Sequence, residues 1–331
     1  MLGFIARRLG LMLVLLVVLS AAVFTLQRYT PADPVRVKLG PNASKAVVDA
    51  EREKLGYDQP VPVQFTRYLG DLGTGDLGDS LRTQRPVTED LRAFLPATLE
   101  LVIGIVFVSA IGGVGLALVT TGESRGSSWL RFSMAAGAAA PAFLLVLAAL
   151  LLFYRQLGWL PGSGRSGFID APVGPTGFLT IDSLLAGRFD VFTDALRHLV
   201  LPVLCGAIAP TVAVARVLRS SLLSVMRSDH IRTARAKGLK ERTVLLRHAL
   251  RNASGPALSL AGLLVASLFT GTLVVEQLVA WPGLGAYTVR SIEATDFPAI
   301  GGVTLVLGAI TIMVNSLIEI LQSIADPRIR L

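Results

Sequence analysis

The chain has 331 residues, of which 52% are hydrophobic and 16% charged, and its mean hydropathy is +0.62. Soluble domains carry about a quarter charged residues, so this composition indicates an integral membrane protein. The net charge of +8 does not indicate nucleic-acid binding, because the basic residues lie between apolar runs too long for a soluble fold. The single cysteine, Cys205, lies in an apolar run and can form no disulfide within the chain.

Six uncharged runs approach or reach the length of about 20 apolar residues that crosses the hydrocarbon core. The first is longer than the apolar part of a signal peptide, so an uncleaved helix is the better interpretation. The fourth contains Pro202 and Pro210, which neighbouring helices can accommodate in a membrane. The sequence therefore predicts an all-α integral membrane protein with six transmembrane helices. The runs are Leu9–Leu26, Leu101–Gly122, Phe132–Tyr154, Leu199–Ala215, Ser254–Val275 and Phe297–Ile318.

Basic residues at the ends of these runs predict the orientation. Four groups of them fall on one side of a six-span protein, and the positive-inside rule makes that side cytoplasmic. Both termini are therefore expected inside, and Thr30–Leu95, with nine basic and ten acidic residues, is expected outside. The four groups are Arg7 with Arg8, Arg125 with Arg131, the basic residues between Arg216 and Arg251, and Arg328 with Arg330.

The external segments also contain helical signals. Val47–Leu55 reads as a short polar helix ending at Gly56, and Val61–Leu72 as a second one. Tyr154–Arg197 reads as an external loop rich in Gly, Pro and Ser. Tyr287–Ala294 could form a short helix at the membrane surface.

The segment Asp229–Leu239 lies in the densest cluster of like charge. From Arg216 to Arg251 there are ten Lys or Arg residues against two acids. Positive-inside bias explains the charge, but not the helical pattern. Ser228 or Asp229 can cap a helix that Gly238 would end, and a second helical segment begins near Lys240. The pattern predicts a helix–glycine–helix elbow between spans four and five.

The cytoplasmic segment resembles the corresponding loop of permease subunits from ATP-driven, binding-protein-dependent importers (ABC importers), in their dipeptide/oligopeptide/nickel branch. The resemblance runs nearly end to end, and its motifs are specific in combination. They are Ala6–Leu9, Pro31–Pro34, Leu55–Pro60, Gly75–Gly78, Ser80–Arg82, Leu95–Glu100, Thr233–Leu239, Arg247–Ala253, Gly255–Pro256, Trp281–Gly285 and Asp326–Arg330.

Two positions depart from the family pattern. The wider importer family has Glu-Ala-Ala six residues before the loop glycine, where this chain has Arg232-Thr233-Ala234. The peptide branch tolerates this form, so the difference does not indicate a loss of function. Ala32 stands where the family more often has glycine.

The resemblance implies a type I ABC importer permease fold, in which a coupling helix inserts into a cleft of a cytoplasmic ATPase. It implies residues 1–95 as the first span with an external segment, 96–322 as the transmembrane domain with a coupling loop at 216–253, and 323–331 as a cytoplasmic tail. Small residues would allow close approach to the ATPase, and basic ones would pair with its acids. The residues assigned to this contact are Asp229, Ile231, Arg232, Thr233, Ala234, Arg235, Ala236, Lys237, Gly238 and Leu239.

The resemblance also implies the partners and the location. These are a second homologous permease, one or two cytoplasmic ABC ATPases, an external solute-binding protein and the lipid bilayer of a bacterial inner membrane, without nucleic acid. The chain lacks a GxxxxGK[ST] phosphate loop, so ATP and Mg²⁺ are expected on the ATPase subunits and no cofactor on this chain.

Two acidic residues are candidates for the translocation path. Glu100 and Glu276 lie near the expected external ends of spans two and five, and ionisable groups at such positions suggest function. Interfacial positions or helix–helix hydrogen bonds explain them as well. His198, His230 and His248 do not converge with Cys205 on a metal site, and no catalytic set is present.

The expected function is therefore that of a non-catalytic permease subunit of a peptide importer. A nickel chelate or another small solute remains an alternative cargo. A self-sufficient secondary transporter is a third hypothesis, but it would be expected to show repeats or charges at mid-membrane depth.

Overall fold

The computed structural model describes residues 2–28, 35, 39, 43–54, 56–121 and 125–325. Within these residues the regular elements are all helices, and Asp79 and Pro86 form an isolated β-bridge. The prediction of an all-α protein is confirmed. The Pro31–Pro34 and Asp326–Arg330 motifs, including Arg328 and Arg330, lie outside the described residues.

The predicted spans correspond to the long helices. Among the described residues, five helices are long and apolar enough to cross a membrane, and a bent helix pair makes a sixth if it counts as one span. Each of the six predicted runs overlaps one of these segments. The five are Leu9–Arg28, Val87–Thr120, Phe189–Val225, Glu241–Phe269 and Phe297–Ile318.

The third predicted span, Phe132–Tyr154, is a bent pair rather than one straight helix. α6 (Arg125–Ala139) and α7 (Ala142–Ala149) meet at Pro141 with a bend of 102°, and α7 continues into the π-helical η1 (Leu150–Gln156). Pro141 has no N–H and disfavours helical geometry at the preceding residue, so it ends α6. The apolar composition is the same on both sides of the bend and did not indicate it.

Two spans are longer than their apolar runs. α5 (Val87–Thr120) begins before the predicted Leu101, and α9 (Phe189–Val225) before the predicted Leu199. At 1.5 Å per residue, the 37 residues of α9 extend about 55 Å, well beyond a hydrocarbon core of about 30 Å. The predicted external loop Tyr154–Arg197 therefore contains the start of α9, and also the short helix α8 (Leu179–Leu185).

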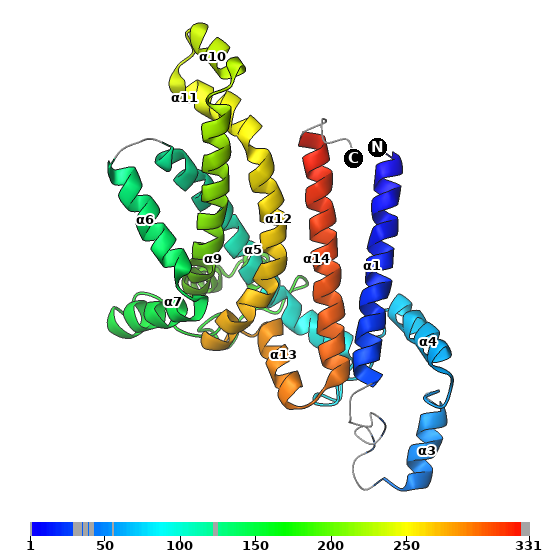
Figure 1. The fold of residues 1–331 in the computed structure, drawn as a ribbon. Helices are drawn as coiled ribbons and strands as arrows, with labels where there is room; N and C mark the ends of the chain where they lie inside the picture. Colours follow the sequence, from blue (N-terminus) through cyan, green and yellow to red (C-terminus); the bar gives the residue numbers. More distant parts are fainter. Residues whose placement is uncertain are drawn as a thin grey trace. The chain divides into compact units, whose positions relative to one another are not determined.

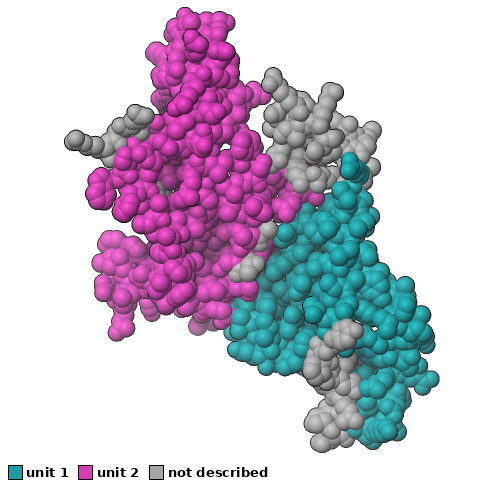
Figure 2. All heavy atoms as spheres, viewed as in Figure 1, with its two compact units in different colours: residues 1–96, 283–313 teal, residues 97–282, 314–331 magenta. Residues whose placement is uncertain are grey.

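The chain divides into two compact units, coloured separately in Figure 2. Unit 1 comprises residues 1–96 and 283–313, and unit 2 comprises 97–282 and 314–331. The domain boundaries predicted from the sequence, at 95/96 and 322/323 with a loop at 216–253, remain a prediction.

Unit 1 contains the first span and the predicted polar helices. The aromatic ring of Phe24 packs against the rings of Phe65 and Tyr68, with centroid distances of 5.4 and 5.5 Å. These contacts join α1 (Leu2–Arg28) to α4 (Val61–Thr74). Gly56 adopts a left-handed φ of +73° after the third helix, as its position predicts. The helices are α1, α3 (Lys45–Lys54), α4, the first part of α5, α13 (Leu284–Glu293) and the first part of α14 (Phe297–Ala325).

Two fully buried acids organise the rest of unit 1. Asp90 accepts hydrogen bonds from Arg85 Nη2 at 2.7 Å and Tyr287 Oη at 3.1 Å. Asp296, just before α14, accepts one from Ser80 Oγ at 2.5 Å. A buried acid needs such donors. The Ser80–Arg82 motif is therefore part of the packing of this unit.

In unit 2, α5 approaches α9 closely at two glycines of α5. A Cβ atom at Gly104 would lie 2.8 Å from the Val203 side chain, and one at Gly113 would lie 2.7 Å from the Val214 side chain. Glycine avoids these clashes because it has no Cβ atom. α12 (Leu250–Leu278) runs beside α9, as Figure 1 shows. The remaining elements of this region are α10 (Asp229–Ala236), α11 (Glu241–Thr243) and the π-helical η2 (Val244–Ala249).

Candidate functional site

The predicted elbow is present between α9 and α12. We call residues 228–243, which contain α10 and α11, the elbow, and the part of unit 2 around it the elbow end (Figure 1). The part of unit 2 around residues 157–188, at the opposite end of α9, is called the loop end. Gly238 turns the chain between α10 and α11 with a φ of +74°. This left-handed conformation is easily adopted by glycine and costs other residues free energy.

The start of α10 differs from the expected cap. Ser228 occupies the N-cap position, but its Oγ donates to the carbonyl of Val225 at 2.5 Å instead of accepting from α10. Asp229 lies in the first turn, where its charge favours the helix dipole. The helix therefore begins where predicted, without the side-chain cap.

The inner face of α10 is buried in its own chain. Ile231 and Ala234 pack into an apolar cluster to which α5, α9, η2 and α12 all contribute. Ala234 is therefore turned away from the surface and does not supply the small contact residue that was expected there. The other buried members are Ala117, Leu218, Leu222, Val244, Ala249, Ala253 and Ala257.

The π-helical η2 lets the chain after the elbow share this cluster. Val244 and Ala249 are both fully buried although they are five residues apart. Five residues of α-helix turn through about 500°, which would place them on different faces, whereas the wider π turn brings them together. The sequence placed the two residues on a helix but did not reveal this change of helical period.

The outer face of α10 carries the basic charge. Arg235 makes two hydrogen bonds to Glu241 across Gly238, Nε–Oε2 at 3.0 Å and Nη2–Oε1 at 2.5 Å. The hydrogen bonds to Glu241 raise the pKa of Arg235 above its ordinary value. Arg232 Nη1 lies 3.4 Å from Asp229 Oδ1. The exposed residues of the predicted contact are Asp229, Arg232, Thr233, Arg235, Ala236, Lys237, Gly238 and Leu239.

Glu100 lies at the loop end, where it holds the loop to α5. Its Oε2 is 2.6 Å from Arg165 Nη2, and its Oε1 accepts from Thr180 N at 2.9 Å and Thr180 Oγ1 at 2.5 Å. Glu100 is buried, with 6% of its side chain exposed, and Arg165 is largely buried, with 16% exposed. The guanidinium of Arg165 also lies over the Trp281 ring, 5.9 Å from its centroid.

Glu276 lies in the same region and is fully buried. Its Oε1 accepts a hydrogen bond from Thr98 Oγ1 at 2.7 Å, which joins α12 to α5. Trp281 Nε1 donates to the Ala97 carbonyl at 2.9 Å and makes a second connection to the same turn of α5. The structure thus shows the helix–helix hydrogen bond that was one of the two interpretations, and the role of Glu276 and Glu100 in the path stays a prediction.

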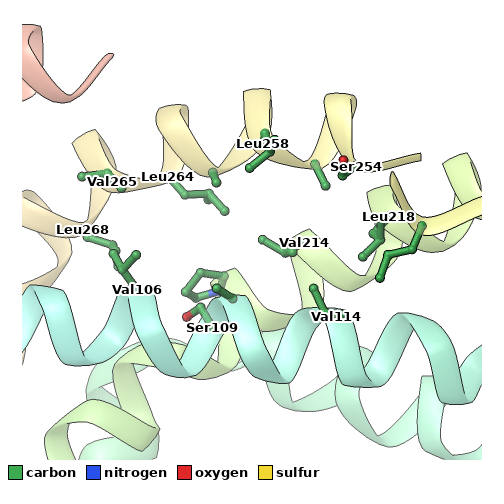
Figure 3. Close-up of a pocket in the computed structure, with 15 residues that line it drawn as sticks. Val106, Ser109, Val114, Val214, Leu218, Ser254, Leu258, Leu264, Val265 and Leu268 are labelled. Atoms are coloured by element: carbon green, nitrogen blue, oxygen red, sulfur yellow. The ribbon is translucent and has the colours of Figure 1, made fainter. Parts of the chain in front are cut away.

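A cavity of about 300 Å³ lies between α5, α9 and α12 (Figure 3). Its lining contains no charged residue, and Glu100 and Glu276 are not part of it. Its two hydroxyl groups are engaged with backbone carbonyls: Ser109 Oγ lies 3.5 Å from Ala207 O, and Ser254 Oγ lies 2.9 Å from Arg251 O. The surface is otherwise apolar, with Val106 and Val114 of α5 facing Leu258 and Leu264 of α12 in Figure 3.

Metal ligands do not gather in the part of the chain that the structure describes. No group of three or more His, Cys, Asp or Glu side chains is close enough there to hold a metal ion. His198 Nδ1 contacts the Asp194 carbonyl at 2.9 Å, and His230 Nδ1 contacts Ser228 Oγ at 3.0 Å. These residues have local structural contacts.

Arg165 is the main residue that the sequence did not single out. It lies in the glycine-rich stretch Gly162–Gly167, which reads as ordinary loop variation. The usable signal was an isolated arginine in a loop next to a membrane, because such a charge needs a partner if it is buried. Its partner Glu100 is 65 residues away, so local sequence could not identify the pair.

The chain is similar to known proteins over its whole length. The family "binding-protein-dependent transport system inner membrane component" matches residues 111–331. A second family, which covers the N-terminal part of such membrane components, matches residues 1–102. The probable D,D-dipeptide transport system permease protein DdpB of Escherichia coli K12 is 42% identical over 311 residues, 92% of this chain and 91% of its own.

Two further relatives cover the complete chain. The dipeptide transport system permease protein DppB of Alkalihalophilus pseudofirmus is 37% identical over 335 residues, all of both chains. The di/tripeptide transport system permease protein DppB of Pseudomonas aeruginosa is 39% identical over 334 residues, 100% of this chain and 99% of its own.

Proposed function

Because the chain belongs to the family of binding-protein-dependent transport system inner membrane components, we propose that it is a permease subunit of an ATP-driven importer of short peptides. Relatives that match along nearly the whole chain carry dipeptide, D,D-dipeptide or di/tripeptide transport in their names. The structural observation that carries the proposal is the elbow. It presents a basic outer face while its inner face is packed into the transmembrane helices.

The chain is a multi-span inner-membrane protein of a system that depends on a binding protein. Within the proposal, a second homologous permease completes the translocation path and one or two ATPase subunits bind at the elbow end, which is cytoplasmic. ATP and Mg²⁺ are bound by those ATPases. The solute-binding protein docks on the opposite side of the membrane and delivers the cargo.

The elbow transmits the movement of the ATPases in this proposal. Arg232 and Lys237 on its outer face pair with acidic groups of the ATPase, while Ile231 and Ala234 carry the displacement into the cluster below. An element with an exposed outer face and a buried inner face can transmit a movement of the ATPase to the transmembrane helices. A solvated loop would not need a buried inner face.

We assign the apolar cavity to the translocation path, as the part of the path that this chain contributes. A dipeptide carries charges at both termini, and an apolar surface cannot stabilise a desolvated charge. The 15 lining residues include no charged side chain, so the cavity offers such a peptide no tight binding site. This supports a path that lets cargo pass and leaves selection to the binding protein.

The proposal is tested by reconstituting the complete importer in vesicles. The chain is combined with the second permease, the ATPases and the binding protein of its importer, and ATP-driven uptake is measured for an L,L-dipeptide, a D,D-dipeptide, a tripeptide and a nickel–histidine chelate. We expect saturable peptide uptake that stops when this chain or ATP is omitted. The isolated chain is the control for a self-sufficient transporter and should neither bind ATP nor carry peptides.

The other results would overturn parts of the proposal. Uptake of the nickel chelate without peptide uptake would replace the cargo and keep the importer. Uptake by the isolated chain along an ion gradient would establish a secondary transporter. Peptide uptake that is independent of the binding protein would contradict the proposed division between selection and passage.

A further inference from the structure

The last turn of α5 is held by arginines from two other helices. The Thr120 carbonyl accepts a hydrogen bond from Arg219 Nε at 2.8 Å, and a longer one from Arg131 Nη1 at 3.3 Å. The final carbonyls of a helix have no partner within it, and positive charge there also favours the helix dipole. Arg219 belongs to α9 and Arg131 to α6, so this one oxygen joins three helices.

Arg219 is next to the residues on which the elbow rests. Leu218 and Leu222 belong to the cluster that buries Ile231 and Ala234 of α10. These two leucines and Arg219 lie within about one turn of α9. The same turn of α9 therefore contacts α10 and holds the end of α5, whose Ala117 belongs to the same cluster.

α5 connects this turn to the loop end. Gly104 and Gly113 allow α5 to approach α9 closely at two positions between these ends. At the loop end, the Ala97 carbonyl accepts from Trp281 Nε1, and Thr98 donates to Glu276. α5 therefore joins Thr120 at the elbow end to the buried contacts with α12 and Trp281 at the loop end.

We propose that Arg219 is a positioning residue that makes α5 move together with α10, so that displacement of the elbow reaches the loop end of unit 2. The proposal rests on the proposed transport function, because it names a residue that links the ATPase contact to the loop end. Arg131 bonds the same oxygen from α6, and none of the α6 side chains that the structure describes belongs to the elbow cluster. The proposal therefore assigns the link to Arg219 and not to Arg131.

The structure provides two matched controls. Arg131→Ala removes the other donor to Thr120 and keeps the α9 bond. Arg216→Ala removes the same charge from the same helix, and Arg216 is exposed with no hydrogen bond or ion pair to the described residues. In Arg219→Ala the Thr120 carbonyl keeps Arg131, so loss of Arg219 does not leave that buried acceptor without a donor. Arg219→Lys keeps the charge and a donor.

The first measurement is the amount of cargo transported per ATP hydrolysed by the complete reconstituted importer. We expect Arg219→Ala to lower this ratio about fivefold or more, the low end of typical coupling between sites, and Arg219→Lys to restore part of it. Arg131→Ala and Arg216→Ala should keep the wild-type ratio. A merely structural role would lower transport and ATP hydrolysis in proportion, and that result would overturn the proposal.

The second measurement is independent of cargo. Spin labels at Val119→Cys and His230→Cys, in a Cys205→Ala background without other cysteines, report the distance between the end of α5 and α10. We expect one narrow distance in the complete complex with and without ATP, and a broad or ATP-dependent distribution after Arg219→Ala. A distance as narrow in Arg219→Ala as in Arg131→Ala would overturn the proposal. Failure of peptide uptake with the expected distances would instead contradict the proposed cargo alone.

Discussion

The two ends of unit 2 use charged residues in opposite ways. At the loop end, Arg165 and Glu100 form a buried ion pair, and Arg165 also stacks over Trp281. At the elbow end, Arg232 is 77% exposed and its neighbour Asp229 96% exposed. The first pair is enclosed by the fold, whereas the second lies in water.

This difference separates architecture from docking. A buried pair that loses one partner leaves an uncompensated charge in a medium of low dielectric, so it holds one structure strongly. Exposed pairs contribute little to folding, and their charges remain accessible to another protein. The exposed basic residues of the elbow thus mark a docking surface, whereas the isolated Arg165 marks a structural contact.

The largest predicted effect follows from removing Arg165. Arg165→Ala leaves the buried Glu100 without its counter-ion, and breaking such a pair costs about 3–5 kcal/mol. We expect a marked loss of thermal stability, measured by unfolding of the purified importer in lipid nanodiscs. Arg165→Met combined with Glu100→Leu should recover much of it, because neither charge then remains buried.

The control for this prediction lies at the same end of the unit. Arg188 pairs with Asp170 and Asp190, but its side chain is 36% exposed. Arg188→Ala removes the same charge and should change the unfolding temperature only slightly. Equal losses from Arg165→Ala and Arg188→Ala would show that burial does not determine how much an ion pair contributes to stability.

The second prediction concerns the turn of the elbow. A side chain at Gly238 would meet no atom within 4 Å, so the constraint is the φ of +74° and not space. The left-handed conformation costs an L-residue roughly 1–2 kcal/mol, and asparagine tolerates it better than valine. We expect Gly238→Val to leave membrane insertion intact and lower ATP-driven uptake about tenfold, while Gly238→Asn retains most of it.

A glycine at the loop end tests whether strain alone causes this loss. Gly187, between α8 and α9, has a φ of +68° and equally open surroundings. Gly187→Val should lower stability to a similar extent without changing the transport obtained per ATP. If Gly238→Val also keeps that ratio, the elbow does not transmit movement through its turn.

The hydropathy pattern was enough to find the helices because lipid-facing helices must be continuously apolar. It could not give their ends. α9 starts ten residues before its apolar run because Asp190 and Asp194 lie on a helix that continues beyond the apolar core. It also could not reveal the bend at Pro141, since interior prolines at 202 and 210 leave α9 continuous. The outcome at each proline depends on packing that is distant in sequence.

The elbow was found from local signals alone, namely the charge cluster, the helical period and Gly238. The orientation of its residues was not. Ala234 was expected on the docking surface, yet it is 7% exposed because Ala117 and Leu218, from other helices, cover it. Arg235 was expected to pair with acidic groups of the ATPase, yet it pairs with Glu241 of its own chain. Contacts across the fold decided both outcomes.

The smallest predicted effect concerns that last pair. Glu241→Gln removes the charge that Arg235 bonds across Gly238, and the exposure of both side chains makes a change in unfolding temperature small. It should instead release Arg235 to the docking surface and strengthen ATPase binding at low salt, an advantage that disappears as salt screens the charges. Titration of detergent-solubilised permease with the ATPase at two ionic strengths measures this.

Asp229→Asn is the matched control, because it removes one acidic charge from the same elbow. The Asp229–Arg232 contact is a single one at 3.4 Å, whereas Glu241 holds Arg235 through two bonds. If only net charge mattered, both variants would strengthen ATPase binding equally. We expect the larger gain from Glu241→Gln, because there the change frees a guanidinium fixed in a bidentate pair. Equal gains would show that the outer face of the elbow acts through its net positive charge alone. Only the buried contacts of Ile231 and Ala234 would then depend on the geometry of the elbow.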